Sequence, residues 1–243
     1  MQPPQRSFPG PWHAFAGGLR AAAFSVFAYV LFATYIGIGA LAHDLGFSLG
    51  WVTCSTLLIW AGPAQVILIS TLGTGSTLVQ AAVAVALSGI RLLPMVVALL
   101  PRIKAPTTRS YALLLPAHLT AVSMWIESFR LTPEIAREHR IAFCNGLGIG
   151  LLISATTATL IGYGLAARLP PTLAAAVLFV TPMSFLVSTA NNSKLLVDRV
   201  ALVLGLILAP LFAVAKIQLD LLFAGLIAGS VAYAVHRFRR TAP

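Results

Sequence analysis

A few polar side chains interrupt the long apolar stretches of this chain, and their types restrict the chemistry they can do. Gln65 offers an amide among apolar neighbours, Arg91 a permanent cation, and His118 an imidazole that titrates near neutral pH. Because burying such groups in apolar segments is costly, they are candidates for function. Arg91 could hold a carboxylate of a substrate or of the protein, or act as an interfacial anchor. His118 could contact substrate or protons, or be a buried, hydrogen-bonded structural residue.

Two proline-containing interruptions repeat one pattern. The stretch Pro63–Thr71 (PAQVILIST) is echoed by Pro182–Thr189 (PMSFLVST), with one residue fewer. Proline removes a backbone donor and clashes with the preceding turn. A lone proline in a membrane helix often marks a packing kink, whereas paired interruptions in two halves of a chain indicate a transporter's binding site. The candidate substrate-binding residues are Gly62, Pro63, Gln65, Arg91, His118, Pro182 and Ser184.

These breaks suit one class of ligand. A helix break frees backbone N–H and C=O groups that lipid cannot satisfy, so they must face protein or water. Freed amides at a helix N-terminus attract a carboxylate, and freed carbonyls could meet an ammonium group. We therefore expect Gln65 and Ser184 to line one central cavity near the bilayer midplane that accepts a zwitterionic amino acid.

Composition places the elements that carry these residues in a membrane. Of 243 residues, 58% are hydrophobic and 9% are charged, with a mean hydropathy of +0.91. This is typical of an integral membrane protein. The net charge of +10 is spread over short gaps between apolar stretches, which excludes a nucleic-acid surface. No HExxH, Walker or GxSxG motif is present, and Cys54 and Cys144 have no CxxC spacing, so we expect no enzyme, no metal site and no cofactor.

The apolar segments predict an all-α, polytopic transmembrane bundle of about seven or eight helices, two of them Pro-interrupted in related positions. A cytoplasmic tail (1–20) would precede a single transmembrane transport domain (21–236), with a basic cytoplasmic tail (237–243) after it. The pairs Gly146-x-x-x-Gly150 and Gly225-x-x-x-Gly229 favour packing inside this bundle, with a dimer seam as the alternative. The segments are 21–42, 48–72, 75–100, 111–129, 141–167, 172–192, 199–215 and 219–236.

The distribution of Lys and Arg predicts the orientation. With eight crossings, ten of these residues fall on the side of the termini and five on the other, so both termini would be cytoplasmic. The basic loop 101–109 falls on the wrong side in this arrangement. A re-entrant piece in 48–72 or 75–100 would invert the two Pro repeats and change the balance to seven against eight.

Three motifs resemble those of the AzlC-type branched-chain amino acid permeases, over about residues 20–215. Trp60–Gln65 (WAGPAQ) is similar to the family's F-A-G-A-S-Q-F, Ser88–Leu93 (SGIRLL) to N-x-R-H-L-L, and Leu178–Phe185 (LFVTPMSF) to L-x-x-x-P-A-x-F. The resemblance implies a bacterial inner-membrane exporter of branched-chain amino acids that works with a small hydrophobic AzlD-like subunit.

Two departures from the family's pattern bear on coupling. Ala121 and Val122 stand where the family often has an Asp-Glu pair, and Ser88 replaces an Asn. His118 would then take over part of the acidic pair's role. Glu127 reads as the partner of Arg130 in an i,i+3 pair at the interface. Acidic residues deep in the apolar segments are nearly absent, which argues against a carboxylate-based proton pathway. The alternative to a transporter is a non-transporting membrane scaffold subunit.

Overall fold

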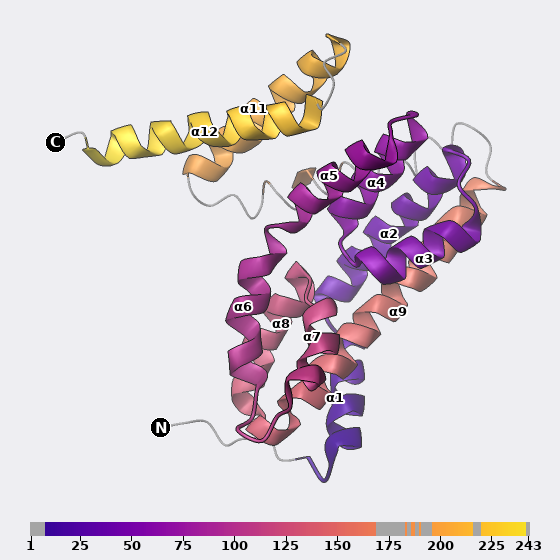
Figure 1. Ribbon diagram of the computed structural model, residues 1–243. Coiled ribbons are helices and arrows are strands. Elements are labelled where there is room, and N and C mark those ends of the chain that lie inside the picture. Colours follow the sequence, from indigo (N-terminus) through magenta and orange to yellow (C-terminus); the bar gives the residue numbers. More distant parts are fainter. Residues whose placement is uncertain are drawn as a thin grey trace. The chain divides into compact units, whose positions relative to one another are not determined.

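The computed structural model describes residues 8–168, 183, 186–187, 190, 196–215 and 220–241. Every regular element in these ranges is helical, which confirms the predicted fold class (Figure 1). The chain divides into two compact units, Met1–Thr181 and Pro182–Pro243. Helix α9 (Arg140–Ala166) is the axis of the first unit, and its 27 residues span about 40 Å. We call the end of the first unit where α9 begins the proximal end, and the opposite end the distal end.

Two successive helices lie along α9 and run in its direction. Helix α1 (Pro11–Ala23) packs on its first half and α2 (Val26–Asp44) on its second half (Figure 1). The approach is so close that a Cβ at Gly146 would overlap the carbonyl of Phe15, and one at Gly162 that of Ile36. A Cβ at Gly150 would meet the side chain of Ala22. The prediction of close packing is therefore confirmed for Gly146 and Gly150. It is not confirmed for Gly225 and Gly229, where an added Cβ would meet no described residue within 4 Å.

The expected segment 21–42 is not one helix. Helix α1 begins at Pro11, within the stretch expected as a tail, and ends at Ala23. Ser25 then adopts an extended backbone, and its hydroxyl caps α2 by accepting a hydrogen bond from the Phe27 N–H at 3.1 Å. A serine with this cap geometry stabilises a new helix start, so the chain breaks here instead of continuing.

The expected segment 48–72 is a hairpin of two short helices, α3 (Leu49–Ile59) and α4 (Gly62–Gly73). The chain enters and leaves it at the distal end, because a Cβ at Gly73 would touch Leu45, four residues before α3. At about 16–18 Å, each arm is about half the thickness of a bilayer's apolar core. We call this the first hairpin. Its shape corresponds to the re-entrant alternative, and a single spanning helix over 48–72 is wrong.

Helices α5 (Leu78–Gly89) and α6 (Leu92–Ile103) replace the expected segment 75–100 and lead from the distal to the proximal end. They are bent by 46° at the Ile90–Arg91 break and pass together as one candidate span. Thr77 and Gln80 form a capping box at the start of α5, which fixes where the chain re-enters the bundle.

The expected segment 111–129 is a second hairpin. Its first arm is the 3-10 helix η1 (Ser110–Leu113) with α7 (Leu114–His118), and its second arm is α8 (Val122–Leu131). Both arms meet the chain at the proximal end, where the Arg102 guanidinium lies 4.2 Å from the Phe129 ring centroid and Arg140 donates to the Arg102 carbonyl at 2.9 Å. Two 3-10 helices, η2 (Thr132–Glu134) and η3 (Arg137–His139), connect α8 to α9.

The second unit contains α11 (Leu196–Val214) and α12 (Asp220–Thr241), which pack on each other. Among the described residues, three helices are long and apolar enough to cross a membrane, namely α2, the η3–α9 stretch and α11, or four with the bent α5–α6 pair. Most of the expected segment 172–192 lies outside the described residues. The prediction of one transport domain over 21–236 stays a prediction.

Candidate substrate site at the two hairpin tips

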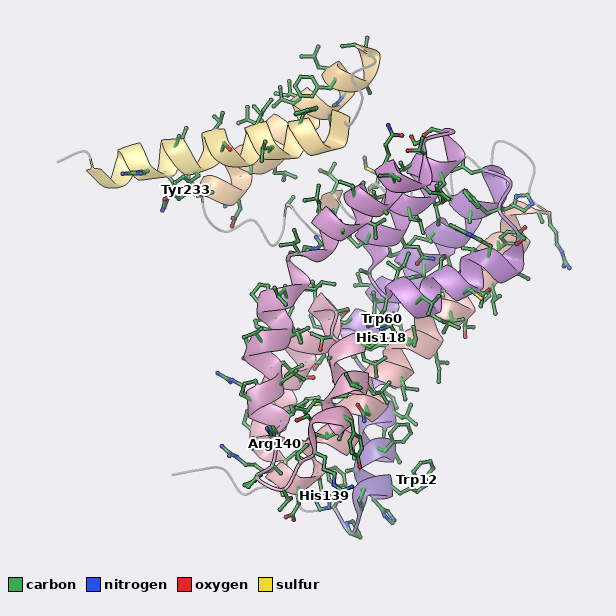
Figure 2. The ribbon with its side chains drawn as sticks, viewed as in Figure 1. Trp12, Trp60, His118, His139, Arg140 and Tyr233 are labelled. Atoms are coloured by element: carbon green, nitrogen blue, oxygen red, sulfur yellow. The ribbon has the colours of Figure 1, made fainter. Side chains whose placement is uncertain are left out.

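The tips of the two hairpins meet, and each donates a side-chain N–H to the backbone of the other. The Trp60 indole donates to the Leu119 carbonyl at 2.8 Å. The His118 Nε2 lies 3.0 Å from the Leu57 carbonyl, and because a carbonyl can only accept, Nε2 carries the proton. Both carbonyls close the first arm of a hairpin and lack an intrahelical partner. Figure 2 shows Trp60 and His118 side by side, between the two ends of the unit.

The backbone at the first tip is held in an uncommon conformation. Trp60 has φ 41° and ψ 38°, and it is the only non-glycine residue with positive φ in the described part of the chain. This left-handed residue reverses the chain between α3 and α4, and Pro63 at the start of α4 fits a first helical turn. The indole is buried and stacks on Tyr35 with 6.4 Å between ring centroids. A left-handed backbone at a non-glycine residue typically costs about 1–3 kcal/mol. Burial of the indole and its hydrogen bond to Leu119 offset this cost at Trp60.

The second arms of both hairpins begin without a side-chain cap. Ser25, Ser48 and Thr77 cap the starts of α2, α3 and α5. By contrast, Ala61 precedes α4 and Ala121 precedes α8, and neither start has a side-chain cap. The first-turn N–H groups there have no intrahelical acceptor, and each helix dipole is positive at this end. The Leu57 and Leu119 carbonyls already accept hydrogen bonds, whereas the two uncapped helix starts present N–H donors, so the tips favour an acceptor with negative charge.

Gln65 lies in the first turn of α4, directly after the first tip, and is fully buried. Its Nε2 donates to the hydroxyls of Ser55 and Thr56, each at 2.8 Å. Both hydroxyls use their own protons on the Val52 carbonyl, so they can only accept from Gln65. This fixes the orientation of the amide and leaves Gln65 Oε1 as a buried acceptor without a partner among the described residues. The amide therefore ties the two arms of the first hairpin together and keeps one oxygen free.

The structure brings four of the predicted site residues to the tips: Gly62, Pro63, Gln65 and His118. His118 is hydrogen-bonded but exposed, so the buried structural reading of this residue is wrong. Arg91 is exposed at the α5–α6 bend, where no hydrogen bond or ion pair joins it to another described residue. Pro182 and Ser184 lie outside the described residues, and the cavity expected between Gln65 and Ser184 stays a prediction.

The second tip, Leu119–Ala121, was not predicted, because these three residues include no glycine or proline. For Glu127 the predicted partner is confirmed, but its burial and its second partner were not predicted. The expected pair with Arg130 is present, with Nε to Oε2 at 2.8 Å, but the carboxylate is buried within the fold. Its Oε1 accepts a hydrogen bond from the Ser25 hydroxyl at 2.8 Å, which joins α8 to the α1–α2 break.

Comparisons with known proteins agree with the first two motifs, Trp60–Gln65 and Ser88–Leu93, whereas the third, Leu178–Phe185, lies outside the matched range. No curated protein and no solved structure matches the chain. The family described as AzlC protein matches residues 26–169, a range that contains both hairpins, the α5–α6 bend and α9. Since this covers more than half of the sequence, the chain belongs to the AzlC family, a family of membrane proteins associated with branched-chain amino acid transport.

Proposed function

We propose that the protein is an inner-membrane transporter that exports branched-chain or other small amino acids, with the substrate bound between the hairpin tips. The observation that carries this site is the contact between the two hairpin tips, each of which is followed by an uncapped helix start, that of α4 or that of α8. A substrate carboxylate would accept hydrogen bonds from these amides and interact favourably with both dipoles. The stacked rings of Tyr35 and Trp60 offer apolar surface for an aliphatic side chain.

The free Oε1 of Gln65 is the nearest candidate acceptor for the substrate's ammonium group. Because Gln65 is fully buried, a substrate reaches this oxygen only after the tips separate. The hairpins enter from opposite ends of the unit, so moving one of them would open the site toward one side of the membrane. The Trp60–Leu119 and His118–Leu57 hydrogen bonds hold the tips together in the closed arrangement.

Flux measurements test the proposal. Protein reconstituted in vesicles, alone and with a small hydrophobic AzlD-like subunit, should exchange labelled leucine, isoleucine or valine against an internal pool of the same amino acid. Arginine and glutamate, whose side chains carry a charge that the apolar wall cannot solvate, should compete poorly. Absence of exchange for every amino acid, with and without the subunit, would favour the non-transporting scaffold.

The fold also supports an orientation in the membrane. Among the described Lys and Arg residues of the first unit, seven lie in its proximal half, Arg168 lies at its distal end and Arg91 lies at the bend between them. The positive-inside rule then places the proximal end in the cytoplasm. In a bundle of eight crossings, loop 101–109 lies on the side opposite the other basic segments. In this fold it lies on the same side as they do. If each later apolar segment crosses once, the C-terminus is cytoplasmic too. The seven are Arg20, Arg102, Lys104, Arg109, Arg130, Arg137 and Arg140.

Cysteine labelling distinguishes this orientation from eight simple crossings. Thr107 lies in the proximal loop and Thr74 in the distal loop, and both are exposed. In a background without Cys54 and Cys144, an impermeant maleimide applied to intact spheroplasts should label Thr74→Cys. It should label Thr107→Cys only after permeabilisation. Eight simple crossings with a cytoplasmic N-terminus require the reverse pattern, which would contradict the two hairpins.

A further inference from the structure

Glu127 lies at a junction between moving parts of the proposed transporter. Among the acidic side chains that the structure describes, it alone is buried. It belongs to α8, the second arm of the second hairpin, and its Oε1 is bonded to Ser25, the residue that caps α2 at the α1–α2 break. Any movement of the second hairpin relative to this break must stretch or replace that hydrogen bond.

The carboxylate is connected to the surface by its second oxygen. Oε2 accepts from Arg130, whose side chain is 64% exposed, whereas that of Glu127 is only 5% exposed. The chain of contacts from Arg130 through Glu127 to Ser25 and the Phe27 N–H therefore leads from the surface to the start of α2. On this path the carboxylate is the group that can bind and release a proton, because a guanidinium keeps its charge.

The surroundings favour a proton over a larger cation at this carboxylate. The guanidinium of Arg130 at Oε2 would repel a metal ion or an ammonium group. At Oε1, the Ser25 hydroxyl would be its one additional ligand. A proton needs no further ligand. The Ser25 hydroxyl can donate to a carboxylate or accept from a carboxylic acid, so it can remain bonded in both states.

Other ionisable groups on the elements around α8 have different contacts. The guanidinium of Arg102 lies over the Phe129 ring, and Arg140 donates to two backbone carbonyls. The Cys144 thiol lies 3.6 Å from the Ser128 hydroxyl. Arg130 is therefore the charged group that is shown to contact the Glu127 carboxylate. Arg20 on α1 and Glu134 on η2 are further charged groups on these elements.

We propose that Glu127 is the proton-binding residue that couples amino acid transport to proton movement, which rests on the proposed function. As a carboxylate it holds Arg130 and Ser25 through charge-assisted hydrogen bonds, which fix the second hairpin against the α1–α2 break. On taking a proton from the aqueous phase it becomes neutral and loses the ion pair, and its remaining hydrogen bonds weaken to about half. The second hairpin is then released, and the same proton leaves to water when the carboxylate re-forms on the other side.

Two kinds of flux test the coupling. Glu127→Gln keeps the size of the side chain and mimics its neutral state. We expect it to lose at least about 90% of net flux driven by a pH gradient, a tenfold effect. Counterflow of the same amino acid at equal pH should continue, because exchange needs no net proton movement. Glu127→Asp should restore part of the driven flux, and the exposed Glu138→Gln is the matched control that should retain all of it.

A spectroscopic measurement is independent of the substrate. Infrared difference spectra between neutral and acidic buffer should show a carboxylic-acid band that shifts in deuterated buffer. This band should be present in the wild type and in Glu138→Gln, and it should be missing in Glu127→Gln. Retained driven flux in Glu127→Gln, or loss of both kinds of flux in a folded Glu127→Gln, overturns the coupling role. A wild type without any flux refutes the proposed function, and the infrared band then decides whether Glu127 binds a proton at all.

Discussion

Replacing Gly162 with alanine is expected to disrupt folding of the first unit, whereas the same change at Gly164 leaves it intact. A Cβ at position 162 would overlap the backbone of Ile36, with the carbonyl oxygen, the carbonyl carbon and the Cα all within 2.8 Å. None of these atoms belongs to a flexible side chain, so α2 and α9 would have to move apart. Overpacking of a core typically costs about 1–3 kcal/mol, and we expect at least about 3 kcal/mol here because both partners are helix backbones.

Gly164 is a matched control on the same helix. A Cβ there meets nothing within 4 Å. Alanine at this position should gain up to about 1 kcal/mol from helix propensity. Thermal unfolding in detergent and the monodisperse fraction on size-exclusion chromatography measure both variants. If Gly162→Ala were as stable and monodisperse as Gly164→Ala, the close contact between α2 and α9 would be wrong.

The sequence was sufficient to predict the helical class and the position of the first break. Gly62-Pro63 interrupts an apolar run in a way that a continuous helix does not tolerate, and the structure ends α3 just before it. The direction of the chain after the break was not predictable from this pattern. An apolar run of 25 residues fits one spanning helix and a hairpin of two half-length arms equally well. The contacts of Gly73 with Leu45 and of Gln65 with Ser55 decide between them, and both depend on tertiary structure.

One sequence signal did point to the hairpins. The basic loop 101–109 contradicted eight simple crossings, and the two hairpins place it with the other basic segments. Polarity inside apolar stretches selected Gln65 and His118, and the structure places both beside the tips, where we propose the site. It also selected Arg91, which lies elsewhere, because polarity alone does not specify which breaks meet. The second break was invisible because Leu119, Thr120 and Ala121 are ordinary helix residues, and the chain departs from a helix there through its contacts with Trp60 and Leu57.

Placing an aspartate at position 121, where the AzlC family often carries one, is expected to reduce leucine transport by this chain without unfolding it, because in this chain the start of α8 has no side-chain cap. Ala121 is the N-cap residue of α8, with an extended backbone (φ −114°, ψ 172°) and no side-chain cap. An aspartate in this position can accept hydrogen bonds from the N–H groups of the first turn, which typically stabilises a helix by about 1 kcal/mol. It would thereby occupy the donors that we assign to the substrate carboxylate, and its charge would repel that carboxylate. We expect transport of leucine to fall by at least tenfold, which corresponds to about 1.4 kcal/mol.

Two further variants separate charge from capping. Ala121→Asn can cap α8 without a charge, so it should reduce transport less than Ala121→Asp. Gly10 provides the matched control, because it is the N-cap of α1, has an extended backbone, no side-chain cap and free space for a Cβ, and lies at the start of α1, away from the tips. Gly10→Asp should leave transport unchanged. Counterflow of labelled leucine measures all three variants, and thermal unfolding in detergent verifies that each is folded. If a folded Ala121→Asp transported leucine like the wild type, the start of α8 would not bind the substrate carboxylate, and the site between the hairpin tips would have to be abandoned.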